Sequence, residues 1–182
     1  INLSDIEKNH LEELQLIRLL INYGSSTITT TNHDRITLAQ FILSELERDN
    51  QALNIKFSFE IFNNILSEIK EKMHLKEAFS KDDFLNHNNS EIRAISAILI
   101  GEKHLLGNWE EKDIIVVQEK DILSKVTKES ILRFKLKRIQ EIIKELLNKL
   151  KNEDGDHQQV MHDFSQLSRI EKKIQKKLGR IF

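Results

Sequence analysis

Proline and cysteine are absent from this chain of 182 residues, and glycine occurs only five times. A chain of this length with average composition would hold about nine prolines, and a helix interior tolerates proline least of all residues. The shortage of turn-forming residues therefore predicts an all-α protein and argues against a β-sandwich or β-barrel. Without cysteine the chain has no disulfide framework, no thiolate metal site and no cysteine nucleophile.

The sequence also lacks any apolar run that approaches the roughly 18 residues needed for a membrane-spanning helix. Its first residues carry neither the basic nor the apolar segment of a signal peptide. We therefore expect a cytoplasmic protein with no membrane partner. The chain starts at Ile1 and not at Met, so we interpret it as a fragment of a longer protein or as a processed product.

Charge is distributed unevenly, although the net formal charge is only −1. Residues 1–100 hold 10 basic and 15 acidic residues, whereas residues 101–182 hold 18 basic and 14 acidic residues. Near-neutrality overall argues against a dedicated nucleic-acid-binding protein. The basic C-terminal half suits either an acidic partner surface or phosphates, unless its lysines simply solvate the outer faces of long helices.

Apolar residues repeat at helical spacing through residues 1–101 and predict an N-terminal helical bundle. We expect helices over residues 4–23, 34–48, 58–74 and 81–86, and a fifth helix that starts at Asn89 or Ser90 and runs to residue 100. Ser4 and Glu7 have the spacing of a capping box at the start of the first helix. Gly24 is expected to end that helix in a left-handed conformation, and the polar segment 25–34 is expected to be a loop.

Residues 102–120 change character and are interpreted as a connector, with Trp109 either anchored on the bundle or exposed to a partner. Residues 121–182 then show the heptad spacing of two helices, over 121–151 and 156–178, that form an antiparallel hairpin. Glu171 interrupts this apolar seam, and Ile170 lies beside it. The seam positions are Leu132, Leu136, Ile139, Ile143, Leu146 and Leu150 in the first helix, and Val160, Phe164, Leu167, Ile174, Leu178 and Ile181 in the second.

Motifs that carry chemistry are missing from the sequence. It contains no glycine-rich phosphate loop, no nucleophile elbow and no HExxH pair, and its seven histidines are scattered. We therefore predict that this fragment is not an enzyme and has no catalytic residues, no metal ligands and no cofactor.

Several short segments, taken in their order and spacing, resemble the C-terminal region of bacterial DnaG-type DNA primases. They are LIRLLINYG at 16–24, FILSELERD at 41–49, GNWEEK at 107–112, FKLKRIQEII at 134–143 and KKLGRIF at 176–182. The resemblance covers nearly the whole chain and implies a helical bundle followed by a helical hairpin, similar to the N-terminal domain of the replicative DnaB-type helicase. It also implies a noncatalytic domain that docks primase onto the N-terminal collar of that helicase, in the primosome, during DNA replication, and that can stimulate the helicase. The zinc-binding and polymerase domains of such a primase, a nucleotidyltransferase, would lie upstream.

We expect the helicase to bind at the end of the hairpin, where a basic amphipathic helix finishes on bulky apolar residues and suits docking into a groove. The expected partner-binding residues are Ile170, Lys172, Lys173, Ile174, Lys176, Leu178, Arg180, Ile181 and Phe182. Two other functions stay open: the N-terminal domain of the replicative helicase itself, and a helical nucleic-acid-binding module that uses the basic hairpin. A domain-swapped homodimer is a further arrangement that would cover the seam of the hairpin.

Overall fold

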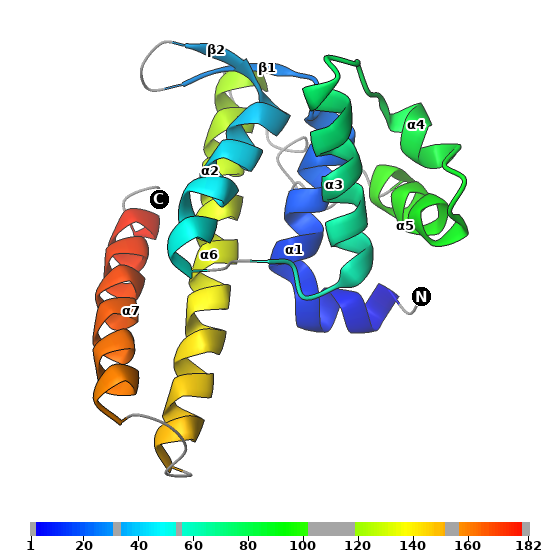
Figure 1. Ribbon diagram of the computed structural model, residues 1–182. Coiled ribbons are helices and arrows are strands. Elements are labelled where there is room, and N and C mark those ends of the chain that lie inside the picture. The colour runs from blue at the N-terminus through cyan, green and yellow to red at the C-terminus, as the bar shows by residue number, and fades with distance from the viewer. Residues whose placement is uncertain (1–2, 31–33, 54–55, 102–118, 152–156, 180–182) are drawn as a thin grey trace, which may run out of the picture. The chain divides into compact units, whose positions relative to one another are not determined.

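A computed structural model describes residues 3–30, 34–53, 56–101, 119–151 and 157–179 (Figure 1). These residues form seven helices and one small antiparallel sheet, so the prediction of an all-α fold is confirmed. The chain divides into two compact units, residues 1–128 and 129–182, and the division falls inside the longest helix, α6 (Glu119–Lys151). The predicted connector and its Trp109 lie outside the described residues, except for the last two connector positions.

Helix α1 is the centre of the first unit, because it contacts each of the next four helices. Six apolar side chains between Leu14 and Ile21 are at most 3% exposed, and a helix that is apolar on every side has to be covered on every side. The helix departs from helical dihedral angles at His10. The bounds of the five helices are α1 Leu3–Tyr23, α2 Leu38–Leu53, α3 Glu60–His74, α4 Lys81–Leu85 and α5 Ser90–Gly101.

The start of α1 differs slightly from the prediction. The helix begins at Leu3, so Ser4 lies inside the helix and not at its N-cap. Helix α5, in contrast, starts at Ser90, one of the two residues predicted for its start, because the Asn89 side chain accepts a hydrogen bond from the backbone N–H of Glu91 at 2.8 Å. An asparagine oxygen in this position satisfies one of the N–H groups that a helix leaves free at its start.

The predicted loop at 25–34 is wrong in part, because it contains strand β1 (Thr27–Thr29). This strand pairs antiparallel with β2 (Arg35–Thr37), with Ile28 opposite Ile36. Ile28 is buried and anchors the β1–β2 hairpin in the core of the first unit. Each strand has only three residues, which is too short to establish an alternating pattern. The helix predicted over 34–48 is also wrong at its start, because it includes β2.

Helix α2 begins at Leu38, four residues later than predicted, because Thr37 caps it. The Thr37 backbone N–H donates to Gln40 Oε1 at 2.9 Å, and the Gln40 backbone N–H donates to Thr37 Oγ1 at 3.1 Å. This reciprocal pair is a capping box. Its Thr-x-x-Gln spacing is a sequence signal that the predicted boundary overlooks.

Gly24 follows α1 without the left-handed conformation that was predicted for it. Its backbone N–H donates to the Leu20 carbonyl at 2.9 Å. A Cβ atom at this position would lie 2.3 Å from the Leu20 carbonyl oxygen and 2.7 Å from the nearest atom of the Phe79 ring. Glycine is therefore required by close packing and not by its φ angle.

Helix α3 ends in a Schellman motif whose left-handed position is held by Lys76 (φ 58°). The Glu77 N–H donates to the Lys72 carbonyl at 2.8 Å, and the Lys76 N–H donates to the Met73 carbonyl at 3.1 Å.

The left-handed conformation of Lys76 carries a steric cost, because its Cβ atom is crowded there. This cost exceeds the entropic cost of the extra backbone freedom that glycine would have in the unfolded chain. Lys76→Gly is therefore expected to raise the free energy of unfolding by roughly 0.5–1 kcal/mol in urea denaturation. Lys76→Ala keeps the Cβ and should change it less; equal effects of the two substitutions would contradict this explanation.

Candidate functional site

The second unit is an antiparallel helical hairpin, formed by the C-terminal part of α6 and by α7 (His157–Leu178) (Figure 1). Its seam follows the predicted heptads. Ile139 of α6 is fully buried, and Val160, Leu167 and Ile174 of α7 are at most 9% exposed. Apolar residues that alternate in spacings of three and four keep the two helices in contact along their length.

A polar group crosses this seam where Glu171 replaces an apolar residue. The Gln140 side chain of α6 donates to Glu171 Oε1 at 3.0 Å, and the Gln175 side chain donates to the same oxygen at 3.3 Å. A single polar position in an apolar seam selects one register, because any shift leaves its hydrogen bonds unmade. Glu171, which interrupts the apolar seam, therefore fixes the register of α7 against α6.

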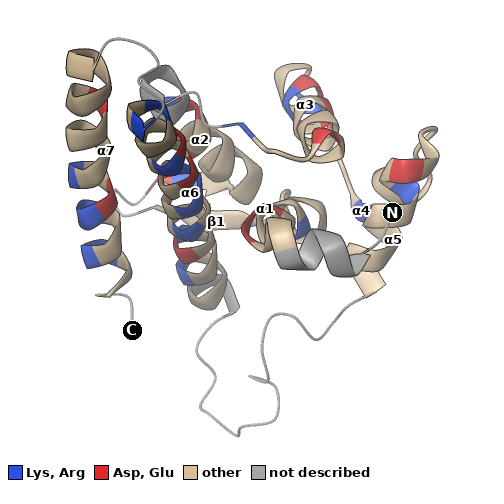
Figure 2. Cartoon of the chain, turned by 90° about the horizontal axis from the view of Figure 1, so that it is seen from below, with Lys and Arg blue, Asp and Glu red and all other residues tan. Residues whose placement is uncertain are grey.

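Positive charge gathers on the C-terminal half of α7, as Figure 2 shows. All five cationic side chains there are exposed, and the one acidic residue among them, Glu171, is the residue bonded to Gln140. Among the described residues none of these five cations forms an ion pair. We call this surface the basic end of α7; it consists of Arg169, Lys172, Lys173, Lys176 and Lys177.

Several cations on other helices, in contrast, form ion pairs within the chain. Lys70 Nζ lies 3.1 Å from Glu47 Oε1, and Arg133 lies 2.7 Å from Glu129 Oε1. Their charges are at least partly neutralised within the chain. The basic end of α7 is therefore a part of the described surface where positive charge stays available to a partner.

The structure divides the predicted contact residues by exposure. Lys172, Lys173 and Lys176 are exposed, whereas Ile174 is 7% exposed and belongs to the hairpin core. Two more apolar residues, Ile170 and Leu178, are half-buried. The three remaining predicted residues lie outside the described part of the chain: Arg180, Ile181 and Phe182.

Two members of the basic end, Arg169 and Lys177, are missing from the predicted contact set. Arg169 precedes Lys172 and Lys173 by three and four residues, and these intervals bring side chains to one face of a helix. Extending the helical spacing by one turn toward the N-terminus would have found Arg169. Lys177 belongs to the same lysine run and is exposed like its neighbours.

A second polar cluster joins α3 to the segment that precedes α5. His87 Nε2 lies 2.8 Å from Glu68 Oε2, and the Asn89 backbone N–H donates to His87 Nδ1 at 3.0 Å. Because Nδ1 accepts that hydrogen bond, the proton of the neutral ring is on Nε2. The Nε2–H group donates a hydrogen bond to the Glu68 carboxylate. Both ring nitrogens are used by the fold, so the ring bridges two segments and has no free nitrogen for general-base chemistry.

Asp83 ties the short helix α4 to α3. Its carboxylate accepts a hydrogen bond from the Ser80 backbone N–H at 2.6 Å and lies 3.3 Å from Lys72 Nζ. The Ser80 N–H is the main cause that lowers the pKa of Asp83, slight burial opposes it, and the Lys72 ammonium lowers the pKa further. The carboxylate is therefore ionised at neutral pH and serves a structural contact.

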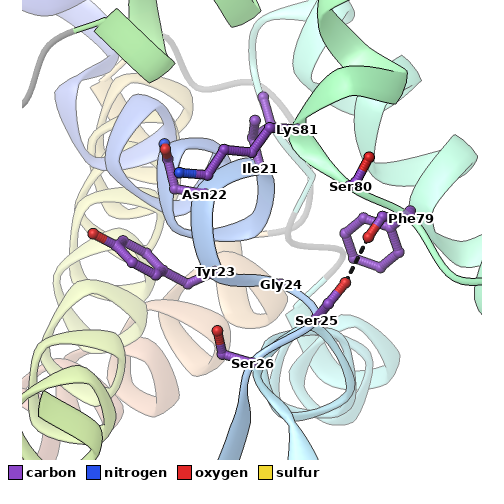
Figure 3. Close-up of a pocket in the computed structure, with 9 residues that line it drawn as sticks. All are labelled: Ile21, Asn22, Tyr23, Gly24, Ser25, Ser26, Phe79, Ser80 and Lys81. Atoms are coloured by element: carbon purple, nitrogen blue, oxygen red, sulfur yellow. Dashed lines mark hydrogen bonds between the residues drawn. The ribbon is translucent and has the colours of Figure 1, made fainter.

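A hollow of about 320 Å³ opens where the end of α1 meets the start of α4 (Figure 3). Its polar groups are largely engaged by the protein. Ser25 Oγ donates to the Phe79 carbonyl at 2.7 Å, the Asn22 amide donates to backbone carbonyls, and Lys81 Nζ lies 5.8 Å from the centre of the Tyr23 ring. This wide hollow has few groups left with which to orient a ligand, so the basic end of α7 is the stronger candidate site.

The part of the chain that the structure describes brings no three His, Asp or Glu side chains together in a way that could ligate a metal ion. Separately, none of the described helices combines the length and apolar character that crossing a membrane requires.

Fold and site together define an all-α protein whose helical hairpin presents an exposed cationic surface. The chain belongs to the family described as a domain of unknown function (DUF8430), whose model matches residues 4–181. Neither the curated proteins nor the solved structures include a match to the chain.

Proposed function

We propose that this chain is the noncatalytic docking domain of a bacterial DnaG-type primase and that the basic end of α7 binds the N-terminal collar of the replicative helicase. The observation that carries the proposal is the group of five exposed cations that form no ion pair with a described residue. The sequence segments that resemble the C-terminal region of such primases support the choice of partner. The architecture of a helical bundle joined to a hairpin is compatible with it.

The chemistry of the surface specifies the kind of contact. Arg169, Lys173 and Lys176 follow one another at intervals of one helical turn, and the whole basic end extends over about 12 Å at a rise of 1.5 Å per residue. The neighbouring apolar side chains are at least half-buried in the hairpin, so attraction between charges has to supply much of the binding. The partner surface is therefore acidic, and salt should weaken the complex.

In this function the domain does no chemistry itself. It would hold the polymerase part of the primase at the replication fork, in the bacterial cytoplasm, where the helicase exposes single-stranded template. A tether of this kind raises the local concentration of the enzyme at its substrate without any new catalytic group.

Reversing charge at the basic end is expected to disrupt this docking. The double variant Lys172→Glu with Lys176→Glu should bind the cognate helicase at least about tenfold more weakly, because each substitution turns an attraction into a repulsion. Isothermal titration calorimetry with the helicase hexamer at two salt concentrations measures the effect.

Exposed lysines on the other helix of the hairpin provide a matched control. Lys137→Glu with Lys144→Glu changes the net charge by the same amount and should leave the affinity close to that of the parent chain. Equal losses in the two double variants would show that only overall charge matters. A folded parent chain that does not bind helicase at about 50 µM would reject the proposal.

The same five cations also favour a second function, binding of nucleic acid. If all five contacted phosphates of single-stranded DNA, the logarithm of the affinity would fall with the logarithm of salt concentration with a slope of about −3.5. The described part of α7 contains the half-buried Phe164 but neither tyrosine nor tryptophan, so it offers little surface on which bases could stack. Fluorescence anisotropy with a labelled oligonucleotide separates the two functions.

A further inference from the structure

A row of exposed residues, most of them cationic, runs along α6 and is separate from the basic end of α7. Its members follow one another at intervals of four and three residues, which keeps them on one face of the helix. The row is about 27 Å long at a rise of 1.5 Å per residue, and it contains no acidic residue. We call it the α6 row; it consists of Arg133, Lys137, Gln140, Lys144, Leu147 and Lys151.

Most of the charge in the α6 row is not neutralised by the hairpin. Its arginine is paired with Glu129, but its three lysines form no ion pair with a described residue. Of the acids farther along α6, Glu141 is bonded to Arg138. The exposed acid Glu145 follows Lys144 by one place, which turns it about 100° away around the helix. Positive charge on the α6 row is therefore available to a ligand.

Helix α7 adds to the positive charge on this side of the hairpin. Gln140 of the α6 row and Gln175 of α7 both donate to the same oxygen of Glu171, so the two glutamines lie on one side of the seam. The exposed Lys172 precedes Gln175 by three residues and lies on that side as well. Although the whole chain is nearly neutral, residues 129–182 hold 13 basic and 8 acidic residues, a net charge of +5. The charge of this unit is typical of a protein surface that binds a polyanion.

We propose that the α6 row binds the phosphate backbone of a nucleic-acid duplex, in addition to the docking of helicase at the basic end of α7. A duplex carries one negative charge per about 1.7 Å of its axis. The three lysines of the row span about 21 Å, the length of about six base pairs. Because contacts to phosphate carry no sequence information, binding is independent of the base sequence. The row has no aromatic side chain on which unpaired bases could stack, so a duplex is favoured over a single strand.

Fluorescence anisotropy of the full chain with a labelled duplex of about 20 base pairs, at about 50 to 300 mM salt, tests the proposal. If the three lysines of the row and Lys172 each contact a phosphate, the logarithm of the affinity falls against the logarithm of salt concentration with a slope of about −3.6. Lys137→Gln with Lys144→Gln removes two contacts, so the slope should become about −1.8. The affinity at the lowest salt concentration should fall at least about tenfold.

Exposed lysines outside the row provide a matched control. Lys56→Gln with Lys149→Gln removes the same charge, and Lys149 lies on the same helix but on another face. This double variant should keep the slope of the parent chain. Circular dichroism verifies that the variants are folded.

Three results would overturn the proposal: a parent chain that does not bind the duplex at about 100 µM, equal losses in the two double variants, or tighter binding of a single strand of the same length. Duplexes of DNA and of RNA present the same phosphates, and titrating both identifies which one is bound more tightly. The titrations contain no helicase, so their failure would leave the docking proposal standing. Conversely, duplex binding by a chain that does not bind helicase would support the α6 row alone.

Discussion

Replacing Glu13 by alanine is expected to lower the free energy of unfolding by about 3 kcal/mol. Glu13 is 4% exposed and reaches from α1 to the start of α3. Its two carboxylate oxygens accept hydrogen bonds from the backbone N–H groups of Ser58, at 2.8 Å, and Phe59, at 3.2 Å. Phe59 is the N-cap residue of α3 and cannot cap the helix with its own side chain. Alanine would remove the acceptor of both N–H groups and a negative charge that the positive end of the helix favours.

Two further variants separate the parts of this effect. Glu13→Gln keeps one acceptor oxygen but removes the charge, so its loss of stability should be smaller than that of Glu13→Ala. Glu12→Ala changes the neighbouring, half-buried carboxylate and should cost less than about 1 kcal/mol. Urea denaturation followed by circular dichroism gives all three values. A Glu13→Ala protein as stable as Glu12→Ala would refute the capping role.

Gly24→Ala is expected to cost about 2–3 kcal/mol of stability, because the added methyl group has no room. The Leu20 carbonyl oxygen, which would lie 2.3 Å from the new Cβ atom, is part of α1 and cannot move without disturbing the central helix. Phe79 closes the other side, and its buried ring packs edge-on against the Phe84 ring with centroids 6.2 Å apart. Both neighbours are fixed by packing, so the clash cannot be relieved by a simple rotation of one side chain.

A second glycine in the same unit serves as the control. A Cβ atom at Gly101 would meet nothing within 4 Å, and the residue ends a helix, so Gly101→Ala should raise the stability by about 0.5 kcal/mol. The same chemical change is thus expected to have opposite signs at the two positions. Thermal denaturation of both variants is the measurement, and a Gly24→Ala protein that melts at or above the parent temperature would contradict the packing argument.

Helices could be predicted from the sequence where their signal is local. The apolar spacing of α3 and the alternating spacing of the hairpin seam are each contained within a few turns of one segment. The capping box formed by Thr37 and Gln40 is also local, but Ile36 continues the helical spacing of α2 back beyond it and conceals the boundary. The strands β1 and β2 could not be predicted for a different reason. Each has only three residues, which are too few to show the alternation of a strand.

Features that join distant segments could not be predicted in this way. The capping of α3 by Glu13 links residues 45 positions apart, and the sequence around either one gives no sign of the other. The requirement for glycine at position 24 likewise depends on Phe79, which arrives from the segment before α4. At the candidate site, the spacing found most of the lysines of the basic end of α7. The heptad spacing also placed Ile174 in the seam, and its burial in the hairpin core removes it from the predicted contact set.

The manner in which each helix is capped bears on the order in which the chain folds. Helices α2 and α5 carry their caps in the preceding residue, Thr37 and Asn89, so their first turns can form from local contacts alone. Helix α3 gains its cap only when α1 brings Glu13 to it, and closing a loop of that length costs entropy before any contact is gained. A peptide that spans α3 alone would lack this cap, and α1 with α3 should therefore form late and together, as a single cooperative step.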